Sequence, residues 1–199
     1  MSTTIDIVLT NNANIASVRA AIARLGYQTR DADRRTVEDA THLILPGVGT
    51  LASARDALDE QGLLAPLAQR LAEPQAPTLA ICVGMQLLSE GSEESPGVAG
   101  FGLLSGIARA FPPNVRRPQF GWNRIAASDN WLASGYVYFA NSFALVDDPG
   151  PGWQTAWATH GVRFLAATRR GRMTACQFHP ELSGAFGQKL IADWIKGDA

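Results

Sequence analysis

Residues 78–88 read TLAICVGMQLL, an apolar run that reaches a cysteine and continues directly in a helical pattern. The part before Cys82 predicts a buried β-strand, and the part after it predicts a helix. Ala80 and Gly84 flank the cysteine two positions away on each side, which leaves room for a tight strand-to-helix turn that exposes a nucleophile. Such a turn sets the sulfur at a helix N-terminus, which favours the reactive thiolate form. The alternative interpretation is an ordinary core cysteine at the end of a strand.

The same alternation of strand and helix occurs earlier in the chain. Residues 5–9 and 42–45 are two further apolar strand candidates. Helical spacing of apolar residues follows each of them, in 15–25, where Asn14 is a suitable N-cap, and in 51–71. Strands that are apolar throughout and alternate with helices predict a parallel sheet that is covered on both faces.

The second half of the chain has a different pattern. Short β-type runs are separated by Gly, Pro, Asn and Asp residues, which predicts antiparallel hairpins attached to the parallel sheet. These runs are 103–110, 122–127, 136–140, 155–159, 164–169 and 173–178. An amphipathic helix is expected over 184–196. No stretch has the composition of a linker, so 1–199 is expected to form a single domain.

The composition excludes several classes of function. The chain has 199 residues, with 17 Lys and Arg against 18 Asp and Glu, and a formal charge of −1. No basic excess is present to hold a nucleic-acid backbone or an anionic membrane, and no apolar run approaches the roughly 18–20 residues that cross a bilayer. The N-terminus lacks the pattern of a secretion signal, and the two cysteines have no zinc-ligand spacing. We therefore expect a cytoplasmic enzyme or binding domain.

A cysteine nucleophile needs a base, and the chain has three histidines. His42 opens a buried strand and is expected to be structural, while His160 precedes a glycine in an expected turn. His179 is followed by Pro180 and Glu181, and residues two apart in an extended segment point to the same side. Glu181 is therefore able to hold one ring nitrogen while the other faces a thiol, as in a catalytic triad. The alternative is a surface His–Glu pair at the end of a strand.

The segment Pro46-Gly47-Val48-Gly49 ends another predicted strand. Its glycines allow the backbone to approach a ligand closely or to turn its N–H groups toward one. A phosphate-binding loop of the P-loop type is excluded, because no Lys-Ser or Lys-Thr pair follows. An ordinary glycine-rich turn is the alternative interpretation.

Four motifs occur in a fixed order along the chain, together with an acidic SEES segment at 92–95. They are PGVG at 46–49, AICVGMQLL at 80–88, GWN at 121–123 and QFHPE at 177–181. In this combination the chain resembles the class I, or triad, glutamine amidotransferases over nearly its whole length, from Ile5 to about Trp194. Within this family it is most similar to the glutaminase subunits of imidazole glycerol phosphate synthase, which belong to histidine biosynthesis.

The resemblance implies an α/β fold of the flavodoxin-like kind, with a doubly wound, mostly parallel sheet and an antiparallel β extension. It implies that L-glutamine is hydrolysed through a thioester on Cys82, with His179 shuttling protons and Glu181 orienting the ring. The oxyanion is then stabilised by backbone N–H groups of Val83 and of the Gly47-Val48 segment, and the PGVG loop has to rearrange before it donates well. No metal or organic cofactor is implied.

The resemblance also assigns the residues that bind glutamine. They are Gly49 of the PGVG loop, Gln86, Glu94 for the α-ammonium group, and the backbone around Ser142 and Phe143. Without the resemblance, Gln86 is expected to be solvent-exposed on a helix, and Glu94 to be one charge of an acidic loop.

The chain contains no recognisable module for an ammonia acceptor, so the resemblance implies a partner. In the family this partner is a separate cyclase subunit with a (β/α)8 barrel, which forms a heterodimer with the glutaminase and receives its ammonia. The cyclase converts a phosphoribulosyl-aminoimidazole intermediate into imidazole glycerol phosphate and an aminoimidazole carboxamide ribotide.

Several positions depart from the usual residues of the family. Asn141 replaces a histidine, Leu182 a lysine or arginine, and Gln119-Phe120 a His-Met pair, while 10–14 departs from the usual Asp-Tyr-Gly form. Two alternatives follow: a paralogous amidotransferase that feeds a different synthase, such as one of a surface-sugar pathway, and a non-catalytic amidotransferase-like regulatory module. The intact cysteine, histidine and glutamate argue against the second, because an inactive copy has no reason to keep all three.

Overall fold

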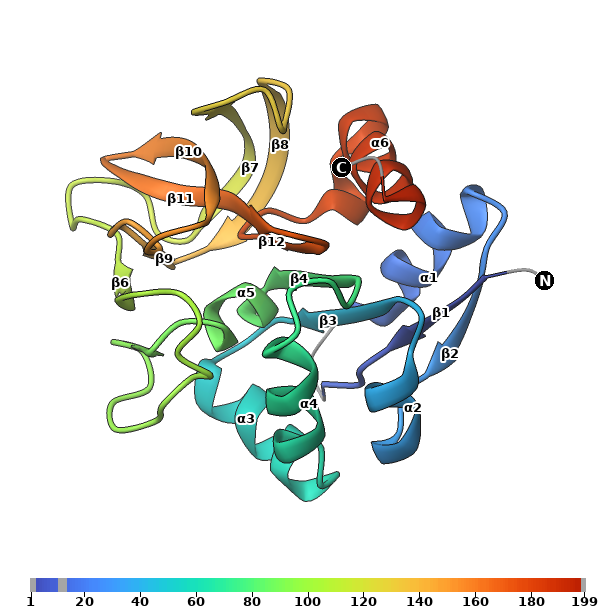
Figure 1. The fold of residues 1–199 in the computed structure, drawn as a ribbon. Helices are drawn as coiled ribbons and strands as arrows, with labels where there is room; N and C mark the ends of the chain where they lie inside the picture. The colour runs from blue at the N-terminus through green and yellow to red at the C-terminus, as the bar shows by residue number, and fades with distance from the viewer. Residues whose placement is uncertain (1–2, 11–13, 198–199) are drawn as a thin grey trace.

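The computed structural model describes residues 3–10 and 14–197, and a mixed nine-stranded sheet runs through this part of the chain (Figure 1). In spatial order its strands are β2 (Gln28–Asp31), β1 (Thr4–Ile7), β3 (Leu43–Gly47), β4 (Thr78–Cys82), β12 (Met173–Cys176), β11 (Val162–Arg170), β10 (Gln154–His160), β7 (Gln119–Ala127) and β8 (Gly135–Asn141). The segment 10–14, which departs from the usual Asp-Tyr-Gly form of the family, includes residues 11–13, and these lie outside the described residues.

The strands β2, β1, β3, β4 and β12 are parallel to one another. Every residue of β3 and of β4 is buried, because these strands have helices on both faces. Their spatial order is the one found in flavodoxin-like sheets, in which the first strand lies between the second and the third. The predicted doubly wound, mostly parallel sheet is therefore confirmed.

The strands β11, β10, β7 and β8 form the antiparallel extension that the second half of the sequence predicts. Buried and accessible residues alternate along most of β8, so one face of the β7–β8 hairpin packs on the core and the other faces solvent. A small separate sheet is formed by β5 (Gly91–Ser92), β6 (Ile107–Ala110) and β9 (Phe143–Leu145).

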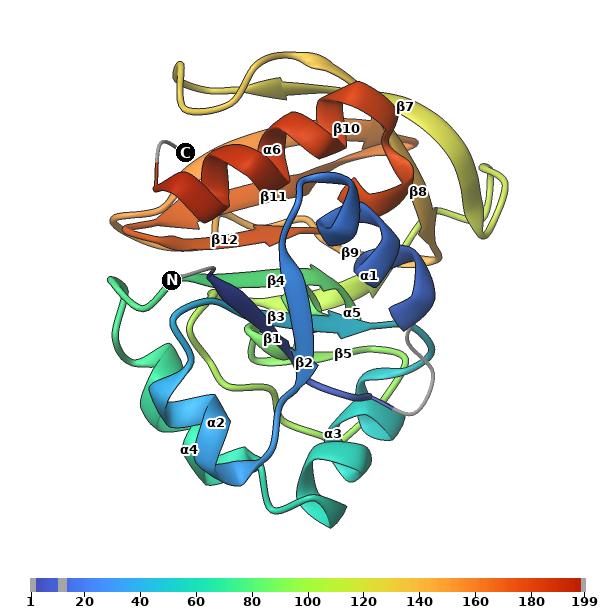
Figure 2. The same ribbon diagram turned by 90° about the vertical axis from the view of Figure 1, so that its right-hand side faces the viewer.

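Helices cover both faces of the parallel strands (Figures 1 and 2). One face carries α1 (Ile15–Arg24) and α6 (Gly184–Lys196), and the other carries α2 (Arg34–Asp39), α3 (Leu51–Glu60) and α4 (Leu64–Leu71). Asn14 caps α1 as predicted, because its side chain accepts from the N–H of Ser17. Within 3–10 and 14–197, no helix has the length and apolar character needed to span a membrane.

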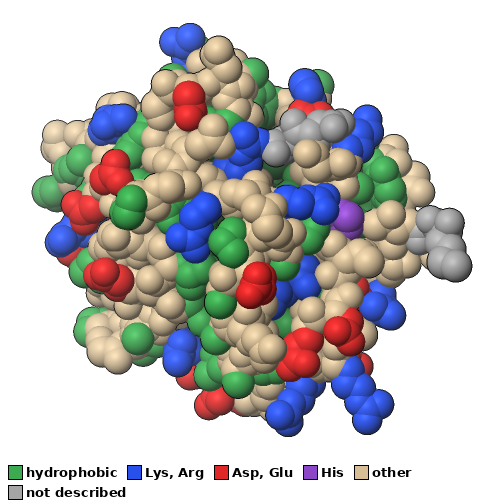
Figure 3. All heavy atoms as spheres, viewed as in Figure 1, with side chains coloured by type: hydrophobic (Ala, Val, Ile, Leu, Met, Phe, Trp, Pro, Cys, Tyr) green, Lys and Arg blue, Asp and Glu red, His purple; other side chains and the backbone are tan. Residues whose placement is uncertain are grey.

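Sequence pattern and structure differ at several places. The strand expected at 173–178 ends at Cys176, because the chain bends at the next two residues, and the short strands β5 and β9 have no predicted run. No apolar run predicts the strand β2 or the helix α2. The strand β2 is a largely exposed edge strand, and the helix α2 has six residues, of which Val37 is buried. The run 103–110 forms the strand β6 only from residue 107 onward, because Gly106 has a φ of +85° and belongs to a turn. The strand expected at 5–9 covers Thr4–Ile7. On the face drawn in Figure 3, basic and acidic side chains are interspersed.

Candidate active site

Cys82 lies at the turn between β4 and α5 (Val83–Leu87). Its φ is +54°, and no other non-glycine residue in the described part of the chain has a positive φ. Such a conformation costs about 1–3 kcal/mol and is typical of functional sites. Gly84 makes the turn feasible, because a Cβ on it would lie 1.9 Å from the carbonyl oxygen of Leu45. The small residue that the sequence places after the cysteine is therefore required by the close packing of α5 on β3.

The register of the parallel strands brings distant segments to the sulfur. Gly47 is paired with Cys82 across β3 and β4, and Cys176 is paired with Ile81 across β12 and β4. The residues directly after β12 therefore continue beside Cys82. This is the carboxyl end of the sheet, where ligands bind in open α/β folds.

His179 and Glu181 form the pair that the sequence predicts, in the segment after β12. The extended conformation expected for this segment is wrong at Glu181, which lies in a short 3-10 helix, Pro180–Leu182, that begins after His179. The ring Nδ1 of His179 lies 2.8 Å from Oε1 of Glu181, and both side chains are buried, so the surface-pair alternative is wrong. Burial lowers the pKa of His179, but hydrogen bonds and charge interactions with Cys82 and Glu181 outweigh it and raise the pKa to about 10. The ring therefore holds its proton at neutral pH, and a positive charge beside the sulfur favours the thiolate.

Gln177 is a neighbour of the sulfur that the sequence motifs alone do not assign. Its Nε2 lies 3.6 Å from Sγ of Cys82, and the side chain is fully buried. The signal that points to it is its place in the QFHPE motif, two residues before His179 and directly after the end of β12. Phe178, between the two, packs edge-on against the ring of Phe139 instead.

A cavity of about 140 Å³ opens in front of Cys82. It is lined by most of the residues that the resemblance assigns, namely Val48, Gly49, Cys82, Val83, Gln86, Glu94, Ser142 and Phe143, and by Pro118, Ala140 and Asn141. Gly47 lies behind this lining, where a Cβ on it would come within 2.9 Å of the Cβ of Val83. The cavity is smaller than the roughly 300 Å³ at which drug-sized sites begin, so it suits a small polar molecule.

Gln86 is buried, so the expectation of a solvent-exposed helix position is wrong. Its Nε2 donates to the carbonyl oxygen of Phe143 at 3.1 Å and to Oε1 of Gln177 at 3.0 Å. Asn141, one of the departures from the family pattern, donates from Nδ2 to the same Phe143 carbonyl at 3.0 Å. The two amides together hold the segment 142–143 in place at the edge of the cavity.

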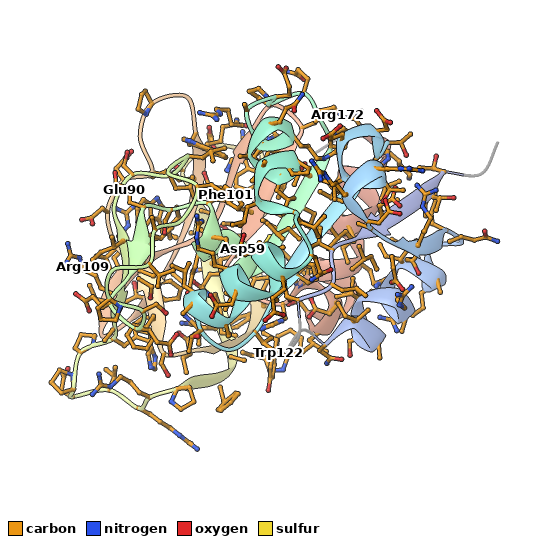
Figure 4. The ribbon with its side chains drawn as sticks, turned by 90° about the horizontal axis from the view of Figure 1, so that it is seen from below. Asp59, Glu90, Phe101, Arg109, Trp122 and Arg172 are labelled. Carbon is orange, nitrogen blue, oxygen red and sulfur yellow. The ribbon has the colours of Figure 1, made fainter. Side chains whose placement is uncertain are left out.

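The acidic segment 92–95 divides its two carboxylates between the cavity and the surface. Glu94 lines the cavity, and burial raises the pKa of its carboxyl group. Glu93 pairs with Arg109 at 3.3 Å outside the cavity; Figure 4 labels Arg109 at the edge of the molecule. Glu94 is therefore the carboxylate of this segment that is able to meet a ligand.

The second cysteine and the other two histidines lie away from this cavity. Cys176 is fully buried in β12, and burial raises the pKa of its thiol, which keeps it unreactive. Nε2 of His42 lies 2.9 Å from the carbonyl oxygen of Ile195, which agrees with the structural role expected for it. Nε2 of His160 lies 2.8 Å from the carbonyl oxygen of Arg116. Among the residues that the structure describes, no three His, Cys, Asp or Glu side chains gather as metal ligands.

A thiol next to a protonated imidazole that is held by a carboxylate is suited to acyl transfer through a covalent intermediate. Comparison with known families matches residues 8–196 to the family described as "Glutamine amidotransferase class-I". The chain belongs to the class I glutamine amidotransferases. The resemblance seen in its motifs is thereby confirmed.

Relatives of this amidotransferase cover nearly all of its length. "Imidazole glycerol phosphate synthase subunit HisH" of Deinococcus radiodurans is 40% identical over 190 residues, which are 91% of this chain and 87% of the relative. "Imidazole glycerol phosphate synthase hisHF, chloroplastic" of Arabidopsis thaliana is 34% identical over 191 residues, which are 92% of this chain and 32% of the relative. A solved structure titled "Crystal structure of glutamine amidotransferase" has a TM-score of 0.76 at 19% identity, covers 96% of this chain and 97% of that one, and supports the fold.

Proposed function

We propose that this amidotransferase is the glutaminase subunit of imidazole glycerol phosphate synthase and acts in histidine biosynthesis. It hydrolyses L-glutamine to glutamate and passes the ammonia to a cyclase subunit. Relatives at 34–40% identity carry the name of this synthase. The observation that carries the proposal is the buried arrangement of Cys82, His179 and Glu181 beside a cavity of amino-acid size.

In the first step, Sγ of Cys82 attacks the side-chain amide carbon of glutamine, and the carbonyl π electrons move to the oxygen. The N–H of Val83, at the start of α5, has no acceptor within the helix and donates to this oxyanion, with the Gly47-Val48 backbone as second donor. The C–N bond then breaks, and His179 gives its proton to the departing ammonia. Glu181 orients the ring throughout, through the bond to Nδ1.

In the second step, water attacks the γ-glutamyl thioester. The ring of His179, now neutral, accepts one proton from the water while the hydroxyl group joins the acyl carbon. The C–S bond breaks, and Cys82 leaves as the thiolate beside the protonated ring. The products are glutamic acid, which ionises, and the starting form of the enzyme.

Glutamine is held by the lining of the cavity. Glu94 faces its α-ammonium group, and the backbone of Gly49, Ser142 and Phe143 contacts its polar atoms. Gln86 accepts from the substrate through Oε1, because the hydrogen bonds described above use its Nε2.

The ammonia acceptor is a cyclase subunit, for which we propose a (β/α)8 barrel and a heterodimer with this chain. The solvent face of the β7–β8 hairpin supplies an apolar docking surface, where Phe120, Trp122 and Tyr136 are exposed by 64%, 56% and 63%. Figure 4 labels Trp122 on this surface. This surface begins at the cavity in front of Cys82. The cavity is lined by Pro118 and Ala140, which lie at the same end of the two strands. We place the complex in the cytoplasm, because both cysteines are free and buried.

The test is glutamate release by the purified chain, alone and with a histidine-pathway cyclase plus its nucleotide ligand. We expect strong activation by the cyclase, and Cys82→Ala to abolish glutamine-dependent synthesis while ammonia-dependent synthesis by the partner continues. Glutaminase activity that ignores this cyclase would instead favour the paralogous synthase suggested by Asn141 and Leu182. A Cys82→Ala variant that still uses glutamine would overturn the assigned nucleophile.

A further inference from the structure

The segment after β12 carries a polar side chain that the reaction described above does not use. Gln177 is fully buried, and a buried amide is unfavourable unless its polar atoms have partners. Its backbone N–H donates to the carbonyl of Ala166 at 2.8 Å, which fixes the main chain at this point. Its side chain lies between two groups of the site, with Oε1 3.0 Å from Nε2 of Gln86 and Nε2 3.6 Å from Sγ of Cys82.

The direction in which this amide points is set by a backbone group. The carbonyl oxygen of Phe143 can only accept, so the atom of Gln86 that faces it at 3.1 Å has to be the amide nitrogen. The same nitrogen faces Gln177, so the atom of Gln177 at that end has to be the oxygen. The other end of the Gln177 amide, which faces Cys82, is therefore the N–H donor.

We propose that Gln177 is a positioning residue for Cys82, whose side-chain amide donates a hydrogen bond that holds the sulfur beside His179 and stabilises the thiolate. A hydrogen bond to an ionised acceptor is stronger than one to a neutral acceptor, so this contact favours the form of the sulfur that attacks. The charged groups that share this environment are His179 and Glu181 from the segment after β12, and Glu94 across the cavity.

The same amides connect the sulfur to the segment proposed to bind glutamine. The chain of hydrogen bonds runs from the carbonyl of Phe143 through Gln86 and Gln177 to Cys82. A ligand that moves the segment 142–143 therefore changes the hydrogen bond on the nucleophile. This part of the inference rests on the proposed function, whereas the contact between Gln177 and the sulfur does not depend on which amide is cleaved.

The test replaces the donor without emptying the space that it fills. Gln177→Met keeps the length of the side chain and removes the N–H donor, and Gln177→Glu keeps the shape and turns a carboxylate oxygen toward the sulfur. The matched controls are Gln188→Met and Gln188→Glu in α6, where the amide donates to the carbonyl of Ala21 at 3.4 Å. The readout is the rate at which iodoacetamide alkylates Cys82 as a function of pH, with the labelled peptide identified by mass spectrometry.

We expect Gln177→Met to move the midpoint of the alkylation profile to higher pH by about one unit, and Gln177→Glu to move it further. Glutamine hydrolysis by the complex with the cyclase should fall about 10- to 100-fold, mostly in kcat, as expected for the loss of one hydrogen bond to an ionised group. The Gln188 controls should leave both measurements unchanged. An unchanged Tm and co-elution with the cyclase in size-exclusion chromatography establish that the variants are folded and assembled.

An alkylation profile of folded Gln177→Met that superposes on the wild-type profile would overturn the inference. If Gln177→Met is unstable, Gln177→Asn carries the same expectation, because it keeps the amide and withdraws it from the sulfur by one methylene group. Alkylation requires no glutamine, so the two proposals can fail separately. If the wild-type complex has no glutaminase activity and the alkylation profile of Gln177→Met is still shifted from that of the wild type, the role of Gln177 is supported and the proposed function is rejected.

Discussion

Gly187 is the point at which α6 rests on the segment that carries His179 and Glu181. A Cβ built on Gly187 would lie 1.8 Å from the carbonyl oxygen of Pro180 and 2.7 Å from its carbonyl carbon. In Gly187→Ala this contact has to open by more than about 1 Å before the atoms reach a normal separation. The movement acts on Pro180, and therefore on the two catalytic side chains next to it.

We expect Gly187→Ala to lower glutamine-dependent turnover about 100-fold, because a misplacement of about 1 Å has an effect of this size on catalysis. Overpacking costs about 1–3 kcal/mol, and the better helix propensity of alanine offsets about 1 kcal/mol of it. The free energy of unfolding should fall by about 0–2 kcal/mol, which lowers Tm by a few degrees in a chain of this length.

The assay for Gly187→Ala is glutamate release by the complex with the cyclase, and co-elution of the two chains in size-exclusion chromatography reports that the complex has assembled. Ala185→Ser, at an exposed position of the same helix, is the matched control and should behave like the wild type. A Gly187→Ala variant with wild-type glutamate release would refute the argument that close packing of α6 places the catalytic pair.

Three other substitutions test the roles assigned to Glu181, Glu94 and Cys176. Folding raises the pKa of His179 from 6.5 to about 10, so the protonated ring stabilises the folded protein fully at pH values below 6.5. This stabilisation is lost as the pH rises toward about 10. The free energy of unfolding of Glu181→Gln should therefore be about 3 kcal/mol below that of the wild type at pH 6. Urea titrations should show this difference becoming smaller between pH 6 and pH 10, and a difference that stays constant would contradict the pairing of His179 with Glu181. Glu94→Gln should raise KM for glutamine about tenfold with little change in kcat. Burial raises the pKa of Glu94, so on acidification the KM of the wild type should begin to rise at a higher pH than it would for an ordinary glutamate. An unchanged KM in Glu94→Gln would show that Glu94 does not bind the substrate. Cys176→Ser should keep its turnover and lose some thermal stability, since it buries a hydroxyl group, and a large loss of turnover in the folded variant would contradict a structural role.

The parallel core is predictable from the sequence because β3 and β4 are buried on both faces and are therefore apolar at nearly every position. The edge strand β2 has the opposite property: its residues Gln28–Asp31 are mostly exposed, so no hydrophobic pattern marks them. Gly106 shows a third case, in which a run of β-type residues contains the turn that shortens the strand.

For the site, local motifs identify Cys82 and the His179–Glu181 pair, because a strand-to-helix turn and an i, i+2 pair are local features. That the cysteine and the histidine meet depends on the register between β4 and β12, which no local pattern contains. Gln177 is harder still to assign, because its role follows from Gln86 in a helix and from a carbonyl in another strand.

The central claim is that glutamine is cleaved through a thioester on Cys82. The most direct test mixes the complex of this chain and the cyclase, with its nucleotide ligand, with glutamine, quenches the reaction in acid within the first turnover, and maps the peptides by mass spectrometry. The account predicts a γ-glutamyl group on the peptide that contains Cys82 and none on the peptide that contains Cys176. Steady glutamate release with no acyl group on Cys82, or with the acyl group on another residue, would contradict it.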